Sequence, residues 1–206
     1  MITRRQQTEA RREATRLIRG AGIVIADEEV ERIEVVDFGL SDRARQGIQV
    51  LTFFSTNRIS AKVLLLLKQV ALPATGVTLD CGHALLAQEN PAQSIALCAE
   101  SGVPFYLHTN DNDWKFDWDL AGGSRNFLHY VEFLFYAREY GYDKFFTPEA
   151  SPRNFDRVEF FTRHIALTGA IWKLVEGLDR RKYRKLMEEE KAMDLLALVQ
   201  KEIYRL

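Results

Sequence analysis

The stretch Gly76-Val77-Thr78-Leu79-Asp80-Cys81-Gly82-His83 decides the fold class that we expect for this chain. It predicts a short buried strand, Val77 to Asp80, that ends in a carboxylate. Two similar runs follow and predict strands over Val103 to His108 and Phe145 to Glu149. Short apolar runs that alternate with longer amphipathic segments are typical of βα units around a parallel sheet.

Helices are expected between and after these strands. Pro91 suits a helix start and Gly102 and Gly141 suit helix stops. The expected helices span 91–101, 126–140 and 157–176, and 180–206 is expected to be largely helical. Because a closed (β/α) barrel needs eight strands and about 250 residues, we expect residues 71–206 to form an α/β unit that is an incomplete TIM-barrel segment.

Residues 1–70 differ in character and predict a small α+β segment before the barrel segment. The apolar and β-branched runs suggest a hairpin at the break Ser55-Thr56-Asn57-Arg58. The expected elements are a helix over 6–19, a short helix from Glu28 to Ile33 capped by Asp27, and strands over 47–54 and 59–67.

Composition narrows the class of protein. The chain has 206 residues, of which 47% are hydrophobic and 28% charged, and 28 basic against 29 acidic residues leave a net charge of -1. We therefore expect a folded protein with no nucleic-acid partner and no membrane segment. Cys81 and Cys98 have neither disulfide-framework nor zinc-finger spacing, so a cytoplasmic location is expected.

Each of the three predicted C-terminal strands ends in a potential ligand for a hard metal ion: Asp80, His108 and Glu149. The carboxyl ends of barrel strands form the catalytic face, so these three side chains are expected to converge. Carboxylates with one imidazole suit Mn²⁺, Mg²⁺ or Co²⁺, with Mn²⁺ as our first choice. Such an ion can polarise a sugar carbonyl and its neighbouring hydroxyl.

A second polar group, His83 with Asp117 and Asp119, could hold another ion or the sugar oxygens. Each residue has a plainer interpretation. An Asp after a strand is often a helix cap, a lone His on a strand is usually a hydrogen-bonded core residue, and loop carboxylates are usually solvated. We interpret His129 and His164 as structural or surface residues. The joint placement of acid, imidazole and acid after three strands favours the metal site.

From residue 76 to about 179 the chain resembles the C-terminal half of the xylose isomerase-like barrel family, in the branch of rhamnose isomerase-like enzymes. The resemblance rests on five segments of the chain: Gly76 to Ala84, Glu89-Asn90-Pro91, Leu107 to Asn112, Asp117-Trp118-Asp119-Leu120 and Glu149 to Pro152. It implies that Asp80, His108 and Glu149 bind one metal, and that His83, Asp117 and Asp119 bind a catalytic metal or the sugar. Glu149 stands where relatives often carry Asp, and the Glu ligand of the first barrel half has no match here.

Residues 1–68 are similar to the start of the cupin-type D-lyxose isomerases, through Ala21 to Ile25, Asp27-Glu28-Glu29, Val36 to Leu40, Gly47 to Val50 and Ser60-Ala61-Lys62. The His-x-His metal pair of that family has no counterpart, because Lys68 to Pro73 follows instead. Two isomerase-like parts therefore join near residues 68–76, through a genuine fusion or a gene-model artefact.

Together these features favour a divalent-metal-dependent aldose-ketose isomerase-like protein with a small-molecule sugar substrate and a possible homo-oligomeric state. The pattern assigns no catalytic base. One alternative is a cupin-type D-lyxose isomerase-like protein. The other is a non-catalytic remnant that associates through open sheet edges.

Overall fold

A computed structural model describes Thr8, Arg12, Arg16 and residues 33–35, 51–53, 60–70, 76–152 and 155–206. Two strands lie in the first part of the chain, β1 (Ile33–Val35) and β2 (Leu51–Phe53), and they pair antiparallel. The remaining elements are α4 (Ser60–Val70), β3 (Val77–Asp80), α5 (Cys81–Leu86), α6 (Pro91–Glu100), β4 (Phe105–Thr109), α7 (Phe127–Glu139), β5 (Phe146–Pro148), α8 (Arg157–Gly177), α9 (Arg180–Glu188), α10 (Ala192–Val199) and the π-helical turn η1 (Gln200–Tyr204).

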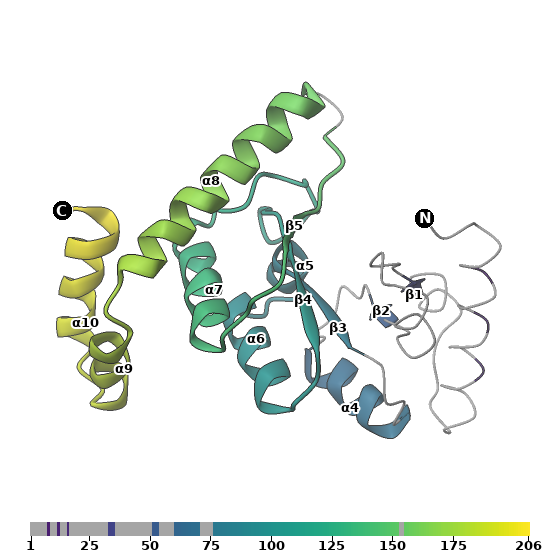
Figure 1. The fold of residues 1–206 in the computed structure, drawn as a ribbon, viewed down its shortest axis with the longest axis horizontal. Helices are drawn as coiled ribbons and strands as arrows, with labels where there is room; N and C mark the ends of the chain where they lie inside the picture. Colours follow the sequence, from purple (N-terminus) through teal and green to yellow (C-terminus); the bar gives the residue numbers. More distant parts are fainter. Residues whose placement is uncertain are drawn as a thin grey trace.

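The sheet that carries the candidate site has three parallel strands in the order β3-β4-β5. Helices α5 and α6 lie between β3 and β4 in the chain, α7 connects β4 to β5, and α8 follows β5 (Figure 1). All four residues of β3 are buried, as expected for a strand that is covered on both faces. This part of the chain is therefore an α/β unit, and its place in a barrel stays a prediction.

Local sequence explains where these helices begin and end. Asn90 caps α6 by accepting hydrogen bonds from the N–H groups of Ala92 and Gln93, and Pro91 occupies the first turn. Gly102 and Gly141 follow the ends of α6 and α7 with positive φ angles of 67° and 66°, which glycine adopts at little cost. The helices and strands predicted from residue 77 onward are confirmed within a few residues, whereas helix α5 was not expected.

Two predictions for the first part of the chain are wrong. The run 59–67 is not a strand in a hairpin: residues 60–70 form helix α4, with Val63 and Leu67 buried one turn apart and Leu65 58% exposed. The predicted end of the helix from Glu28 to Ile33 is also wrong, because Ile33 is the first residue of strand β1. The rest of that helix and its Asp27 cap lie outside the described residues.

The other expected elements of residues 1–70 are described in part. Within the predicted helix 6–19, the described residues Thr8, Arg12 and Arg16 are helical. Within the predicted strand 47–54, Leu51–Phe53 is β2. The other residues of both predictions lie outside the described part of the chain.

Helix α4 belongs to the same core as the α/β unit. Val63 and Leu67 join the buried cluster that includes Ile95 and Cys98 of α6. Ser60 is 5% exposed and its hydroxyl donates to Glu89 at 2.7 Å. The boundary predicted near residue 70 thus passes just after a helix that packs against α6, and it stays a prediction.

Two simple findings complete the fold. Cys81 and Cys98 are both buried free thiols, so the chain's two cysteines form no disulfide. Within the ranges that the structure describes, no helix is long and apolar enough to cross a bilayer.

Candidate functional site at the carboxyl edge of the sheet

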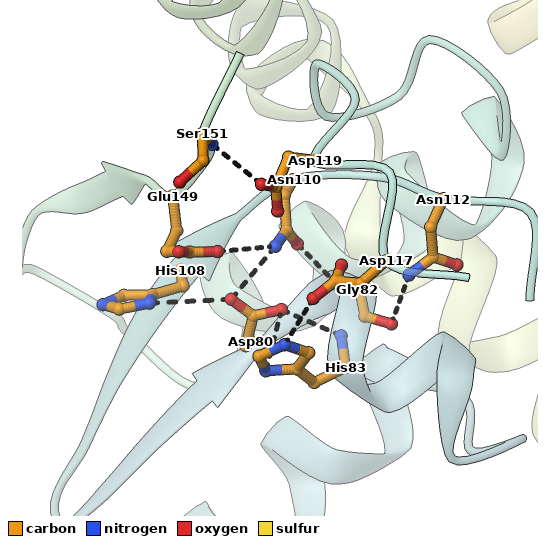
Figure 2. Close-up of polar contacts among 10 residues, drawn as sticks. All are labelled: Asp80, Gly82, His83, His108, Asn110, Asn112, Asp117, Asp119, Glu149 and Ser151. Carbon is orange, nitrogen blue, oxygen red and sulfur yellow. Dashed lines mark hydrogen bonds and ion pairs between the residues drawn. The ribbon is translucent and has the colours of Figure 1, made fainter. Parts of the chain in front are cut away.

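The three strand-end residues that the sequence singled out lie in one cluster. Asp80 ends β3 and is paired in register with His108 of β4, while Glu149 directly follows β5 and its N–H donates to the Thr109 carbonyl at 3.1 Å. Figure 2 shows their side chains on the same side of the strand ends. Parallel register explains this convergence, because successive strands end at the same edge of the sheet.

Asn110 lies at the centre of the cluster and was not among the predicted site residues. Its amide nitrogen donates to Asp80 Oδ2 at 3.1 Å and to Glu149 Oε2 at 3.2 Å, while its oxygen accepts from the Gly82 N–H at 2.6 Å (Figure 2). The Asn110 side chain is fully buried. We call Asp80, His83, His108, Asn110, Asp117 and Glu149 the Asn110 cluster.

The structure brings the second predicted group close to the first through His83. His83 Nε2 lies 2.9 Å from Asp117 Oδ2, and His83 Nδ1 lies 3.7 Å from Asp80 Oδ1. Asp119 instead accepts a hydrogen bond from the Ser151 N–H at 2.8 Å, which ties its loop to the segment after β5. Asp119 has a φ angle of 51°, a left-handed conformation that Asp tolerates better than most residues.

Electrostatics within the cluster follow from burial and close charges. Burial acts to raise the pKa of Asp80, but His108 and His83 outweigh it, so the pKa lies below its ordinary value. Burial, and after it the charges of Asp80 and Asp119, raises the pKa of Glu149. Burial acts to lower the pKa of His83, yet Asp117 and then Asp80 raise it to about 9, so His83 is an imidazolium at neutral pH.

Asp80 also has the plainer role that an acid after a strand suggests. Its Oδ1 accepts from the His83 N–H at 2.8 Å and thereby caps helix α5. One oxygen of Asp80 thus caps α5, and the other accepts from Asn110 and lies near His108.

The loop after β4 is held by a separate set of hydrogen bonds around Asp111. This carboxylate is 1% exposed and accepts four of them: from the backbone N–H groups of Asn112, Arg125 and Asn126, and from the Asn126 side-chain amide. The Asp111 backbone also pairs with Leu120. We call this the Asp111 network, and it fixes the loop that carries Asp117 and Asp119.

The ligand types in the Asn110 cluster suit a hard divalent cation, but the side chains do not surround one common point. Two carboxylates and an imidazole face one another, and His108 Nδ1 is buried without a hydrogen-bond partner, at 3.6 Å from Asp80 Oδ2. Yet among the described residues no three His, Cys, Asp or Glu side chains are placed to hold one ion as they stand. The Asn110 amide fills the space between the carboxylates.

The two remaining histidines have surroundings that fit a structural role. His164 is fully buried in α8 and accepts from the Gly122 N–H at 3.1 Å, and burial lowers its pKa to about 4. His129 packs its ring edge-on to Trp114, with 5.1 Å between the ring centroids.

A cavity of about 240 Å³ lies elsewhere, between α7 and the C-terminal helices. Its walls are mainly apolar and aromatic, and Glu132 contributes the carboxylate. Because it contains none of the residues of the Asn110 cluster, we do not treat it as the candidate catalytic site.

Comparison with known proteins finds relatives for part of this chain. No family model matches. The D-lyxose ketol-isomerase of Cohnella laeviribosi is 42% identical over 65 residues, which are 32% of this chain and 36% of that protein. The D-lyxose ketol-isomerase of Thermofilum sp. is 38% identical over 73 residues, 35% of this chain and 41% of that protein, and the D-lyxose/D-mannose isomerase of Thermosediminibacter oceani is 38% identical over 66 residues, 32% and 36%.

These matches confirm a sugar isomerase relationship for the N-terminal part of the chain. The match extends over no more than 41% of the length of these relatives. They do not support the xylose isomerase-like resemblance of the C-terminal part, which stays a prediction, as do the metal and the cytoplasmic location.

Proposed function

We propose that this chain is a divalent-metal-dependent sugar isomerase that interconverts an aldose and a ketose, and that β3 to β5 form a segment of a (β/α) barrel. The observation that carries the proposal is the meeting of Asp80, His108 and Glu149 at the ends of three neighbouring parallel strands. The sugar isomerase relationship of the N-terminal part supports the same substrate class.

In this proposal Asp80, His108 and Glu149 hold the cation, with Mn²⁺ as first choice and Mg²⁺ or Co²⁺ as substitutes. When bound, the cation supplies Lewis-acid polarisation of the sugar carbonyl and hydroxyl oxygens. His83 and Asp117 are both partly exposed, with 21% and 37% of their side chains accessible, so their polar atoms can reach a sugar from solvent. The His83 imidazolium would donate to a sugar oxygen and Asp117 would accept from a hydroxyl.

The loop beside this pair contributes aromatic surface. Phe116 and Trp118 flank Asp117 in sequence, are 60% and 57% exposed, and have ring centroids 5.6 Å apart. Aromatic faces pack well against the apolar C–H faces of a sugar while neighbouring polar groups bind its hydroxyls. Asp119, held by Ser151, keeps the far end of the loop in place.

Calorimetric titration of the metal-free protein with Mn²⁺ tests the metal site. We expect wild type to bind and both Asp80→Asn and His108→Gln to lose at least tenfold in affinity. Asp80→Asn is preferred to alanine because asparagine keeps an oxygen to cap α5. Asp179→Asn, at the cap of α9 and outside the cluster, is the matched control and should bind as wild type.

A coupled assay for ketose formation from D-lyxose and D-mannose tests the reaction, because these sugars name the relatives. Activity that requires Mn²⁺ and falls in the two cluster variants supports the proposal. Absence of Mn²⁺ binding by folded wild type at micromolar concentrations would overturn the metal site.

A cupin-type D-lyxose isomerase-like activity is the second candidate, and the names of the relatives favour it. It predicts that isomerase activity survives Asp80→Asn and His108→Gln, because that activity would not depend on the Asn110 cluster. The third candidate is a non-catalytic protein that associates through β5, which among the described strands has a neighbour on one side only. It predicts no Mn²⁺ binding and an oligomer that grows with protein concentration in size-exclusion chromatography.

A further inference from the structure

The Asn110 side chain forms its hydrogen bonds with Gly82, Asp80 and Glu149, at the candidate site. Its orientation is settled by chemistry, because the Gly82 N–H at 2.6 Å requires an acceptor and the two carboxylates require a donor. The oxygen therefore faces Gly82, and the NH₂ group faces Asp80 and Glu149. An amide NH₂ has two hydrogens, one for each carboxylate.

The hydrogen bonds of the neighbouring residues show that Asn110 is not the residue that stabilises the loop. Asp111 accepts the N–H groups that hold the loop, and Asn112 donates to the Gly82 carbonyl at 2.7 Å and accepts from the Trp114 N–H at 2.9 Å. The loop is therefore stabilised by these two residues. Asn110 instead links the turn at Gly82 to both carboxylates.

We propose that Asn110 is a positioning residue that holds Asp80 and Glu149 facing each other before a cation arrives, with its NH₂ group in the place that the cation takes. The cation part of this inference rests on the proposed function. Asp80 is buried and Glu149 is partly buried, and two carboxylates this close repel each other unless a positive or hydrogen-bond-donating group lies between them. The Asn110 amide supplies a hydrogen-bond donor without adding a charge, so Asp80 and Glu149 stay close together and face each other. A cation that enters between them would replace these two hydrogen bonds.

Gly82 allows the orientation of the Asn110 amide. A Cβ at this position would lie 2.7 Å from Asn110 Oδ1, which is closer than real Cβ contacts. The absence of a side chain lets the amide oxygen reach the Gly82 N–H, and this contact turns the NH₂ group toward the carboxylates.

A double-mutant cycle in EDTA tests the positioning role without any metal. Asn110→Asp keeps the oxygen that accepts from Gly82 but puts a third carboxylate oxygen beside the other two, so we expect Tm to fall by roughly 5–10 °C. Adding Glu149→Gln restores a neighbour that can donate to the new carboxylate, and should recover at least half of that loss. Asn112→Asp is the matched control: it lies in the same loop, and Glu149→Gln should recover none of its loss.

Adding Mn²⁺ tests the cation part. Asn110→Asp should gain more in Tm from saturating Mn²⁺ than wild type gains, because its extra carboxylate becomes a ligand. Additive losses in the EDTA cycle would overturn the positioning role even if wild type binds Mn²⁺. Coupling in the cycle with no Mn²⁺ binding by wild type would leave Asn110 as the residue that holds the carboxylates and would overturn the proposed metal function.

If Asn110→Asp does not fold, NMR of the ¹⁵N-labelled wild type gives the same decision. The Asn110 side-chain NH₂ signals should exchange slowly with water in EDTA and shift on addition of the diamagnetic ion Mg²⁺. Signals that exchange quickly in EDTA, or that stay unchanged while Mg²⁺ binds, contradict the proposal.

Discussion

The Asp111 network and the Asn110 cluster meet on the loop after β4 and use their carboxylates in different ways. Asp111 alone accepts four N–H groups, three of them from the backbone. In the cluster, two carboxylates share one amide nitrogen, with histidines nearby. Asp80 accepts one backbone N–H, that of His83, besides the shared amide, and among the described residues Glu149 accepts the shared amide alone.

Under the proposed function, this difference separates carboxylates that stabilise the loop from carboxylates that bind a ligand. A buried carboxylate surrounded by backbone donors holds a loop and has little left to offer a ligand. In the cluster the pKa of Asp80 is lowered by His108 and His83, whereas burial and the charges of Asp80 and Asp119 raise the pKa of Glu149, and the cation of the proposed function would offset that repulsion.

Asp111→Ala should cost about 3–5 kcal/mol of unfolding free energy, because it leaves several buried N–H groups without an acceptor. Urea unfolding followed by circular dichroism measures this loss. Mn²⁺ should restore none of it if the network is purely structural. A loss below about 1 kcal/mol would mean that water replaces the carboxylate and that the loop is not held as described.

The pH dependence of stability should show that His164 of α8 is a further buried acceptor for the backbone of this loop, through the Gly122 N–H. Its pKa is lowered to about 4 in the folded protein from an ordinary value of 6.5, so the folded state resists its protonation. Its contribution is therefore full above pH 6.5 and is lost as pH falls toward 4, to a total of about 2–3 kcal/mol.

The His164 contribution is isolated by measuring wild type and His164→Gln between pH 4 and 7. Glutamine keeps an acceptor for the Gly122 N–H but does not titrate, so the difference in stability between the two proteins should shift in favour of the variant as pH falls. A difference that stays constant over this range would contradict the assignment.

Gly82→Ala should cost about 2 kcal/mol, because the new Cβ would lie 2.7 Å from Asn110 Oδ1 and 3.0 Å from Asn112 Nδ2. Thermal unfolding measures it. Gly169→Ala in α8 is the control of opposite sign: nothing lies within 4 Å of its Cβ, so the better helix propensity of alanine should add about 0.5–1 kcal/mol. Equal effects of the two substitutions would show that Gly82 is not a close-approach position.

Asp80→Ala should be less stable than Asp80→Asn by about 1 kcal/mol, because asparagine keeps the cap of α5 and alanine does not. Urea unfolding in EDTA gives this difference. Both variants should nevertheless lose Mn²⁺ binding, which separates the cap from the ligand role. Equal stability would indicate that the carboxylate contributes no cap in solution.

The hydrophobic pattern of the sequence predicted the α/β part well, because its strands are short and apolar and its helices are bounded by glycine, proline and capping residues. It failed at residues 59–67, where a run rich in leucine and valine suits a buried strand and a helix equally. The pairing of Val63 with Leu67 on one buried face, with Leu65 outside, is visible only once α4 packs against α6. Helix α5 was missed because it begins directly after β3, with a glycine in its first turn.

The candidate site could be predicted where side-chain type alone signals chemistry. Asp80, His108 and Glu149 stood out as acid, imidazole and acid at strand ends, and parallel register brings them together. Asn110 carries no such signal, because asparagine after a strand usually forms a turn. The sign available in the sequence was its place in the fully polar run 109–112, directly after His108, and the structure shows that all four residues of this run are buried.

The hydrogen bonds of Ser60 set a practical limit on shortening this protein. Ser60 donates its hydroxyl to Glu89 and also lies 2.8 Å from the Ser94 hydroxyl, while Val63 and Leu67 cover α6. A polypeptide that began after Val70 would expose apolar surface on α6 and remove the hydrogen bonds that the backbone N–H and hydroxyl of Ser60 donate to Glu89. Expression trials should therefore retain residues 60–70, since the α/β unit would otherwise expose apolar surface and be prone to aggregate.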